Sequence, residues 1–242
     1  MLCSGVSQRR TALLLGTSAP TVARKLRFLA RRKRAEHEAF LRELAPLPTA
    51  LDDVQFDEME THEHSKWKPL SIALLVSRER KILGFRVSRM PARGVDAAKA
   101  LKKYGPRPDE RKAALHSLFA DLKPVLAQTL KFTSDQKPLY APIVRAHFPA
   151  ARHEQVKGKR GCITGQGELK KIGFDPLFAL NHTAAMLRAN ISRLFRRTWC
   201  TTKNRHRLVD HLWLYAAFHN QVLTGKRRDI LAPNHPPQPC KS

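Results

Sequence analysis

Hydrophobic positions near the N-terminus follow a helical period that is interrupted once. The pattern predicts helices over 7–15 and 21–30, with a charged helical continuation over 31–44. Ser7 suits the N-cap of the first helix, and Pro20 suits the opening turn of the second. Two short helices around a tight break are typical of a helix-turn-helix, whose second helix can enter the major groove of DNA. An ordinary helical hairpin is the alternative interpretation.

Downstream, the pattern becomes that of strands and helices. Val54 and Phe56 alternate with Gln55 and Asp57, which predicts a half-buried strand. The expected elements are strands over 54–61, 70–76 and 82–87 with a hairpin turn at 77–80, a helix over 109–127, a strand over 129–133, a helix over 139–148, a strand over 153–156, and helices over 177–198 and 205–222. This order predicts an α/β fold, preceded by a small all-α region.

The charge balance narrows the class of partner. With 45 Lys and Arg against 20 Asp and Glu, the 242 residues carry a formal net charge of +25. Such an excess favours a polyanionic partner, and nucleic acid is the commonest one. No apolar run reaches the roughly 18 residues of a membrane-spanning helix, and neither a membrane partner nor a secretory signal is expected. The four cysteines form no CxxC pair, so no disulfide framework is expected and a reducing cytoplasm fits.

One segment is strongly acidic and contains no Lys or Arg. Between residues 51 and 63 its carboxylates are Asp52, Asp53, Asp57, Glu58, Glu60 and Glu63. Asp57 lies within the predicted strand, where a carboxylate is unfavourable, and a divalent cation would neutralise it. A solvated acidic strand edge is the alternative. Glu58 and Glu60 are expected to point outward or to support the metal ligands from behind.

A second candidate, Asp135, follows the strand predicted over 129–133 and precedes a predicted helix. Catalytic residues often lie at strand ends. The alternative is structural, because Ser134 or Asp135 could cap the helix that follows.

The region from 176 to 209 contains no acidic residue. Its basic residues are Arg188, Arg193, Arg196, Arg197, Lys203, Arg205 and Arg207. Asn181 and Arg188 are seven residues apart, which places them on one face of a helix. An amphipathic surface helix with solvated arginines is the alternative interpretation.

Four segments together resemble DDE transposases, most nearly those of the insertion-sequence-one type. They are VQFDEMETH, KWKPLSIALLVSRERKILGFRV, SDQKPLY and LRANISRLFRRTWCTTKNRHRLVDHLWLYAAFHN. The resemblance spans about residues 5–223 and implies an RNase H-like mixed sheet flanked by helices. It implies a helix-turn-helix region and linker over 1–47 and a catalytic domain over 48–225. The basic, Pro-rich composition of residues 226–242 predicts a disordered tail.

The resemblance also implies three side chains that hold Mg²⁺ or Mn²⁺. Asp57 matches the first and Asp135 the second. The third would be a Glu seven residues before Arg188, but the sequence has Asn181 there. Asn can offer a carbonyl oxygen to a metal ion, so Asn181 is the expected third ligand. The other acids nearby, Glu168 and Asp175, are the alternatives for the third ligand if the register of the match is shifted.

The implied activity is metal-dependent cleavage and joining of double-stranded DNA at the ends of an insertion sequence. Arg188 would bind a phosphate near the scissile bond. The DNA backbone would be followed by Arg193, Arg196, Arg197 and Lys203, and the terminal repeat recognised by Arg24, Lys25 and Arg27. A homo-oligomer on DNA, in the bacterial cytoplasm and associated with the nucleoid, is expected.

Three other functions remain open from the sequence. A transposase-derived protein that binds DNA without cutting it is favoured by Asn181 in place of Glu. A transcriptional regulator with a small-molecule domain would leave the arginine-rich helix without a purpose. An RNA-binding protein is compatible with the charge, but the aromatic signature of an RNA-recognition motif is missing.

Overall fold

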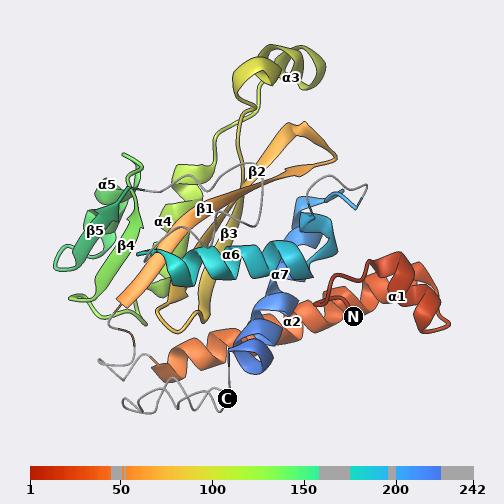
Figure 1. Cartoon of the computed structure of the whole chain (residues 1–242), viewed down its shortest axis with the longest axis horizontal. Helices are drawn as coiled ribbons and strands as arrows, with labels where there is room; N and C mark the ends of the chain where they lie inside the picture. Colours follow the sequence, from red (N-terminus) through yellow and green to blue (C-terminus); the bar gives the residue numbers. More distant parts are fainter. Residues whose placement is uncertain (45–50, 52, 158–174, 196–199, 225–242) are drawn as a thin grey trace.

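A five-stranded sheet forms the centre of the molecule in the computed structural model (Figure 1). The structure describes residues 1–44, 51, 53–157, 175–195 and 200–224. The strands are β1 (Asp53–Glu63), β2 (Ser65–Ser77), β3 (Ile82–Arg89), β4 (Lys131–Asp135) and β5 (Arg152–Val156). They lie side by side in the order β3-β2-β1-β4-β5.

Two kinds of pairing build this sheet. β1, β2 and β3 are antiparallel, and the chain reverses through the positive φ angles of His64 and Arg80. β4 then pairs in parallel with β1, and β5 pairs in parallel with β4. In the RNase H-like arrangement, the first strand of a three-stranded antiparallel meander also pairs in parallel with a later strand. The predicted fold class, an RNase H-like mixed sheet flanked by helices, is confirmed.

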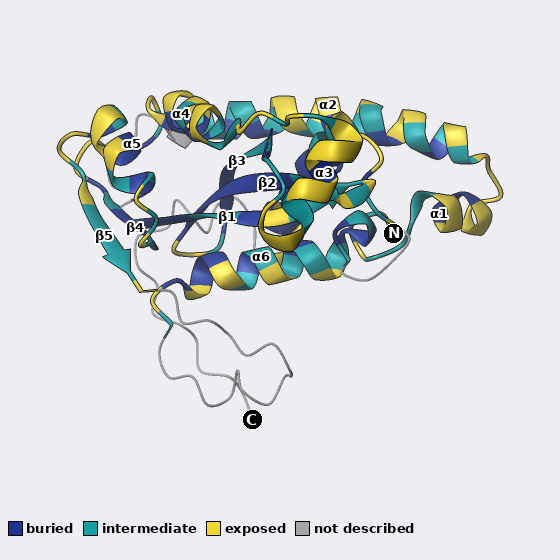
Figure 2. Cartoon of the chain, turned by 90° about the horizontal axis from the view of Figure 1, so that it is seen from above, coloured by how far each residue is buried: buried dark blue, intermediate teal, exposed yellow. Residues whose placement is uncertain are grey.

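Helices cover both faces of the sheet (Figure 2). They are α1 (Gln8–Leu14), α2 (Ala19–Leu44), α3 (Ala97–Tyr104), α4 (Arg111–Leu122), α5 (Tyr140–His147), α6 (Phe178–Asn190) and α7 (Arg205–Phe218). The alternation of β1 sends Val54 and Phe56 into a core shared with α4 and α5. Gln55 and Asp57 therefore face the other side, where α6 and α7 supply the core.

Helix α2 is continuous over 26 residues, which confirms the predicted helical continuation after residue 30. It lies against the edge strand β3, where Leu83 O is 2.8 Å from His37 Nε2, and it also packs against α7. Leu26, Ala30 and Phe40 are buried along its inner face. Helix α2 therefore contacts β3 at this point and, through α7, joins the N-terminal helices to the main core.

The helix predicted over 177–198 is wrong at its C-terminal end. α6 ends at Asn190, Ile191 is extended (φ −102°, ψ 105°), and a short 3₁₀ turn spans Ser192–Leu194. The predicted apolar positions Leu187, Ile191 and Leu194 are nevertheless all buried. A short 3₁₀ turn after α6 thus buries the same apolar positions as a longer α-helix would. The spacing of apolar residues alone does not distinguish the two.

Other boundaries differ in smaller ways. β2 begins at Ser65, five residues before the prediction, and β4 runs through Asp135 rather than ending at residue 133. Helix α3 is not predicted, because its surroundings are polar and contain Gly94 and Gly105. Within the described residues, no helix has the length and apolar character needed to cross a bilayer.

Several predicted features lie outside the described residues. They are the Pro-rich end of the 1–47 region, Glu168, Arg196, Arg197 and the tail over 226–242.

Candidate metal and DNA site

The register of the central strands brings two of the predicted site residues together. Gln55 in β1 is the partner of Thr133 in β4. Asp57 and Asp135 each lie two residues beyond this pair, which is the last of the β1–β4 ladder. In parallel strands, residues at the same level point to the same face. Asp57 and Asp135 therefore converge on one side of the sheet, 78 positions apart in the sequence.

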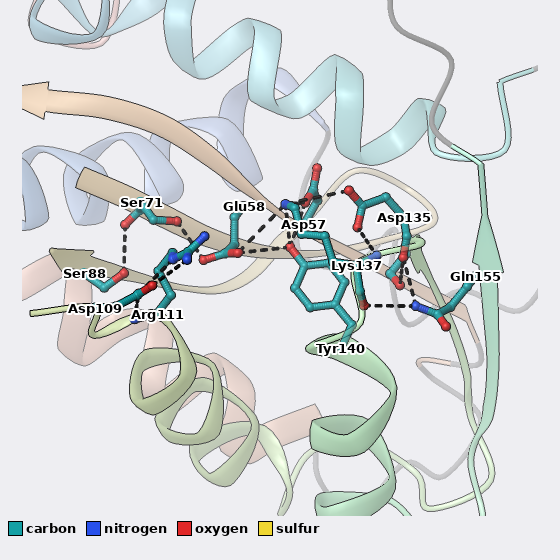
Figure 3. A network of polar contacts seen from close by, with 11 residues as sticks. Asp57, Glu58, Ser71, Ser88, Asp109, Arg111, Asp135, Lys137, Tyr140 and Gln155 are labelled. Atoms are coloured by element: carbon teal, nitrogen blue, oxygen red, sulfur yellow. Dashed lines mark hydrogen bonds and ion pairs between the residues drawn. The ribbon is translucent and has the colours of Figure 1, made fainter. Parts of the chain in front are cut away.

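A lysine lies between the two carboxylates (Figure 3). Lys137 Nζ is 2.6 Å from Asp57 Oδ1 and 3.7 Å from Asp135 Oδ2. The same nitrogen is 3.9 Å from Glu58 Oε2. The acidic segment of β1 contains no Lys or Arg of its own, but the fold supplies one from the turn after β4.

Glu58 belongs to the opposite face of β1, and its side chain is only 3% exposed. The Ser71 hydroxyl donates to Glu58 Oε1 at 2.8 Å, and the Tyr140 hydroxyl lies 3.3 Å from Oε2. Tyr140 also donates to Asp57 Oδ1 at 2.8 Å. Glu58 therefore does not point outward. It supports the cluster from behind, as one of the two sequence expectations proposed.

The turn that carries Lys137 is held by its neighbours. Asp135 Oδ1 accepts from the Lys137 backbone N–H at 3.3 Å. From β5, Gln155 Nε2 donates to the backbone carbonyls of Asp135 and Lys137 at 3.2 and 3.3 Å. Helix α5 begins only at Tyr140 and has no side-chain cap. The alternative in which Ser134 or Asp135 caps this helix is therefore wrong.

Burial and neighbouring charges raise the pKa values of two groups in this cluster. Burial raises the pKa of the Asp135 carboxyl, and the negative charge of Asp57 raises it further. Burial, together with the charges of Asp57 and Glu58, raises the pKa of Tyr140 well above its usual range. The phenol therefore remains a hydrogen-bond donor at neutral pH. Acidic groups packed this closely are stabilised by a cation among them.

The third predicted ligand occupies a separate cluster at the start of α6. Asn181 is exposed, and its Nδ2 donates to Asp175 Oδ2 at 2.9 Å. Asp175 Oδ1 accepts from the Leu177 backbone N–H at 2.9 Å. Asp175 thus organises the first turn of α6, with Asn181 as its partner. The two described candidates for the third ligand are therefore neighbours in space.

Gln55 attaches this first turn to β1. Its Nε2 donates to Pro176 O at 2.9 Å, and its Oε1 accepts from the Leu180 backbone N–H at 3.0 Å. Gln55 and Asp57 share one face of β1. The start of α6, with Asp175 and Asn181, therefore lies over the face of the sheet that carries Asp57.

The donors present fit a divalent ion in their chemistry. Mg²⁺ and Mn²⁺ prefer carboxylate and carbonyl oxygens, and Asp57 and Asp135 already approach one positive charge from two strands. Within the described ranges, no group of three or more His, Cys, Asp or Glu side chains is arranged to hold a metal ion. The cluster brings two carboxylates to one face of the sheet and holds Lys137 between them.

A basic cleft of about 630 Å³ lies between the N-terminal helices and the segment before α7. Its basic lining residues are Arg9, Arg27, Arg193, Lys203 and Arg207, and none of the described residues that line it is a carboxylate. Among these five, the described part of the chain contains an ion pair only for Arg207, with Asp210. Residues predicted to contact DNA separately, from the helix-turn-helix and from the region around 193–203, thus share one concave surface.

Arg193 is held in this cleft by a neutral histidine. Its Nε donates to His211 Nδ1 at 3.1 Å, so His211 Nε2 carries the proton donated to Leu2 O at 2.8 Å. Burial and the charge of Arg193 lower the pKa of His211 to about 4. A neutral acceptor orients the guanidinium without neutralising it. The positive charge of Arg193 therefore remains available to an anion.

The remaining basic candidates lie on either side of this cleft. Arg24 and Lys25 are exposed on α2, where Arg24 Nη2 donates to Thr21 Oγ1 at 3.3 Å. Arg188 lies two turns after Asn181 on α6 and lines a hollow beside β1 together with Glu60 and Lys66. Helix α6 therefore begins beside Gln55 of β1 and ends at Asn190, just before Ser192 and Arg193 of the basic cleft.

Sequence reasoning did not identify Lys137, Tyr140 or His211 as part of a site. One signal for Lys137 was available, since a Lys two residues after Asp135 is close enough to reach it. The contacts of Tyr140 with β1 and of His211 with Arg193 depend on chain segments that meet only in the fold.

Comparison with known proteins gives little. No protein-family model and no curated protein sequence matches the chain. Among solved structures, a pre-cleavage Mos1 transpososome aligns with 88% of this chain and 74% of its own, at 10% identity and a TM-score of 0.23. A Mos1 mariner paired end complex with Mn aligns with 78% and 71%, at 14% identity and a TM-score of 0.20. These TM-scores are too low for the likeness to support a function for this chain.

Proposed function

We propose that the chain is a DDE-type transposase that binds double-stranded DNA at the ends of an insertion sequence and cleaves and joins strands with Mg²⁺ or Mn²⁺. The proposal is supported by the parallel pairing of β1 with β4 just before Asp57 and Asp135, and by Lys137 Nζ, which lies 2.6 Å from Asp57 Oδ1 and 3.7 Å from Asp135 Oδ2.

In this proposal, Asp57 and Asp135 hold the metal ion from adjacent strands. The third ligand comes from Asn181 or Asp175 at the start of α6, or from Glu168. A bound Mg²⁺ or Mn²⁺ supplies neutralisation of the scissile phosphate and a lowered pKa for the attacking water. Gln155 fixes the turn after Asp135, and Gln55 fixes the first turn of α6. These contacts hold the ligands before DNA arrives.

The DNA backbone lies in the basic cleft and follows α6 to the carboxylates. The 13 residues of α6 correspond to about 20 Å of helix, and Arg188 lies between its two ends. Arg193 and Lys203 contact phosphates from the cleft, and the predicted backbone contacts of Arg196 and Arg197 belong to residues outside the described ranges. Arg24, Lys25 and Arg27 contribute to recognition of the terminal repeat. Two DNA ends brought together require a homo-oligomer.

A cleavage assay tests this function. Supercoiled and linear DNA carrying the element's own ends is incubated with the full chain and Mg²⁺ or Mn²⁺, and strand breaks and 3′-end joining are measured. Asp57→Asn and Asp135→Asn should reduce cleavage to background while DNA binding remains. Asp121→Asn is the matched control, because Asp121 lies on α4 and pairs with Arg86 at the surface. Equal activity in all variants would contradict the assignment.

A second function is favoured by a specific observation. Lys137 lies between the carboxylates, and the Asn181 amide is bonded to Asp175. Both features suit a transposase-derived protein that binds DNA without cutting it. In that case the wild-type chain binds DNA ends tightly but makes no breaks with either metal ion.

A further inference from the structure

The position of Lys137 has a consequence for any metal ion that binds beside it. Its ammonium contacts carboxylates that belong to two strands and both faces of β1: Asp57 at 2.6 Å, Asp135 at 3.7 Å and Glu58 at 3.9 Å. Lys137 Nζ also lies 2.9 Å from the Tyr140 hydroxyl. The nitrogen is thus at the point where the acidic side chains converge, as Figure 3 shows.

A divalent ion held by Asp57 and Asp135 has to occupy much of the same volume. Two cations a few ångströms apart in a partly buried site repel each other strongly. The ammonium and the metal ion therefore cannot both bind these oxygens. The Lys137 side chain is 37% exposed, whereas that of Glu58 is 3% exposed. The lysine, rather than the buried carboxylate, is the group with room to move away.

We propose that Lys137 is an internal counter-ion that a divalent metal ion must displace before Asp57 and Asp135 can bind it. This inference rests on the proposed metal-dependent function and adds a control on it. Without metal, Lys137 neutralises the cluster and keeps the two strands' carboxylates together. The same contact lowers the metal affinity of the chain, because part of the binding free energy is spent on moving the lysine.

The test is a titration of the full, DNA-free chain with Mn²⁺, followed by the electron paramagnetic resonance signal of the free ion. Lys137→Met removes the charge and keeps most of the side-chain length, and Mn²⁺ should then bind at least about tenfold more tightly than to the wild type, because the competing cation is gone. Lys137→Arg keeps a cation in place, and its affinity should remain no higher than that of the wild type.

Lys131→Met is the matched control. Lys131 is also 37% exposed and also pairs with a carboxylate, Glu154, at 2.9 Å, but this pair joins β4 and β5 outside the cluster. Its removal should leave Mn²⁺ affinity unchanged. Thermal unfolding gives a second measurement. Lys137→Met should unfold at a lower temperature than the wild type without metal, and Mn²⁺ should raise its unfolding temperature by more. If Lys137→Met does not fold, Lys137→Gln serves in both measurements.

The outcomes separate this inference from the proposed function. The inference is supported if Lys137→Met binds Mn²⁺ more tightly than the wild type and neither Lys137→Arg nor Lys131→Met does. Equal Mn²⁺ affinity in the wild type and Lys137→Met, abolished in both by Asp57→Asn, overturns the inference and leaves the metal site intact. Failure of all of them to bind Mn²⁺ in the millimolar range overturns both proposals. Binding by Lys137→Met but not by the wild type supports the inference and favours the non-cutting protein.

Discussion

Two basic side chains illustrate how differently a positive charge can be placed in this molecule. Lys137 is surrounded by Asp57, Asp135 and Glu58, so its charge is balanced inside the chain. Arg193 is oriented by the neutral ring of His211, so this contact leaves its charge unbalanced. A net charge of +25 therefore says little about which cations would bind DNA under the proposed function. That depends on the partner each one has in the fold.

Arg193→Ala should weaken DNA binding in a salt-dependent way. If Arg193 neutralises one phosphate, the slope of log affinity against log salt should fall by about 0.9. Fluorescence anisotropy of a labelled duplex over a salt series measures this slope. Arg145→Ala is the control, because Arg145 is an exposed cation on α5 and does not line the cleft. Identical slopes for the two variants would exclude Arg193 from the phosphate path.

The residues of the candidate site were predictable to the extent that their signals are local. Asp57 is a carboxylate within a predicted strand, and Asp135 follows the end of another. Both positions can be recognised from a few neighbouring residues. The contact between Lys137 and Asp57 joins positions 80 apart, and no short pattern encodes it. The third ligand stays a prediction, since spacing favours Asn181 whereas the fold places Asp175 beside it.

At the scale of elements, the start of α6 is fixed to the sheet by one buried side chain. Gln55 is 8% exposed, and its amide satisfies both Pro176 O and the Leu180 N–H. A buried polar group that loses its partner is costly. The position of the first turn of α6, and of any metal ligand on it, therefore depends on β1.

Gln55→Leu should loosen this end of α6. Two backbone groups lose their partner, so the free energy of unfolding should fall by about 1–3 kcal/mol. Amide hydrogen exchange over residues 177–183 should become faster, while exchange in α7 changes little. Gln221→Leu, at an exposed position, should stay within about 0.5 kcal/mol of the wild type. Unchanged exchange in α6 would show that Gln55 does not hold it.

The elements themselves were predictable where hydrophobic period and strand length agree. β1, β3, α5 and β5 match their predicted ranges closely. The end of α6 was not, because a 3₁₀ turn over Ser192–Leu194 buries the same apolar positions as a longer helix. Helix α3 was missed because its segment is polar, and its aromatic contact, Trp67 with Tyr104, comes from β2.

At the scale of the whole molecule, Glu110 connects three distant elements. It precedes α4 and accepts hydrogen bonds from Arg89 of β3 at 2.8 Å and from Arg205 of α7 at 2.6 Å. These arginines, with Arg89 contributing most, lower the pKa of Glu110 to about 2. The ionised carboxylate therefore helps to join the sheet to helices on both of its faces.

This connection predicts how stability depends on pH. The folded-state pKa of Glu110 is about 2, below the ordinary value of a glutamate carboxyl, so its contribution to stability is complete above about pH 5 and is lost as the pH falls towards 2. Urea midpoints measured across this range should fall less steeply for Glu110→Gln than for the wild type. Glu79→Gln, in the exposed β2–β3 turn, should follow the wild-type curve. Parallel curves for all three proteins would contradict the role of Glu110.

Helix α2, which contacts β3, also has a length that matters for the proposed function. Its 26 residues amount to about 39 Å of rigid rod, a distance close to one turn of double-stranded DNA. Contact with β3 through His37 and with α7 along its side leaves this rod little freedom to pivot. Under the proposed function, the interval between the bases recognised at the N-terminal helices and the bond cut at the carboxylates is therefore fixed. The protein's substrates would have to carry that interval in their own sequence.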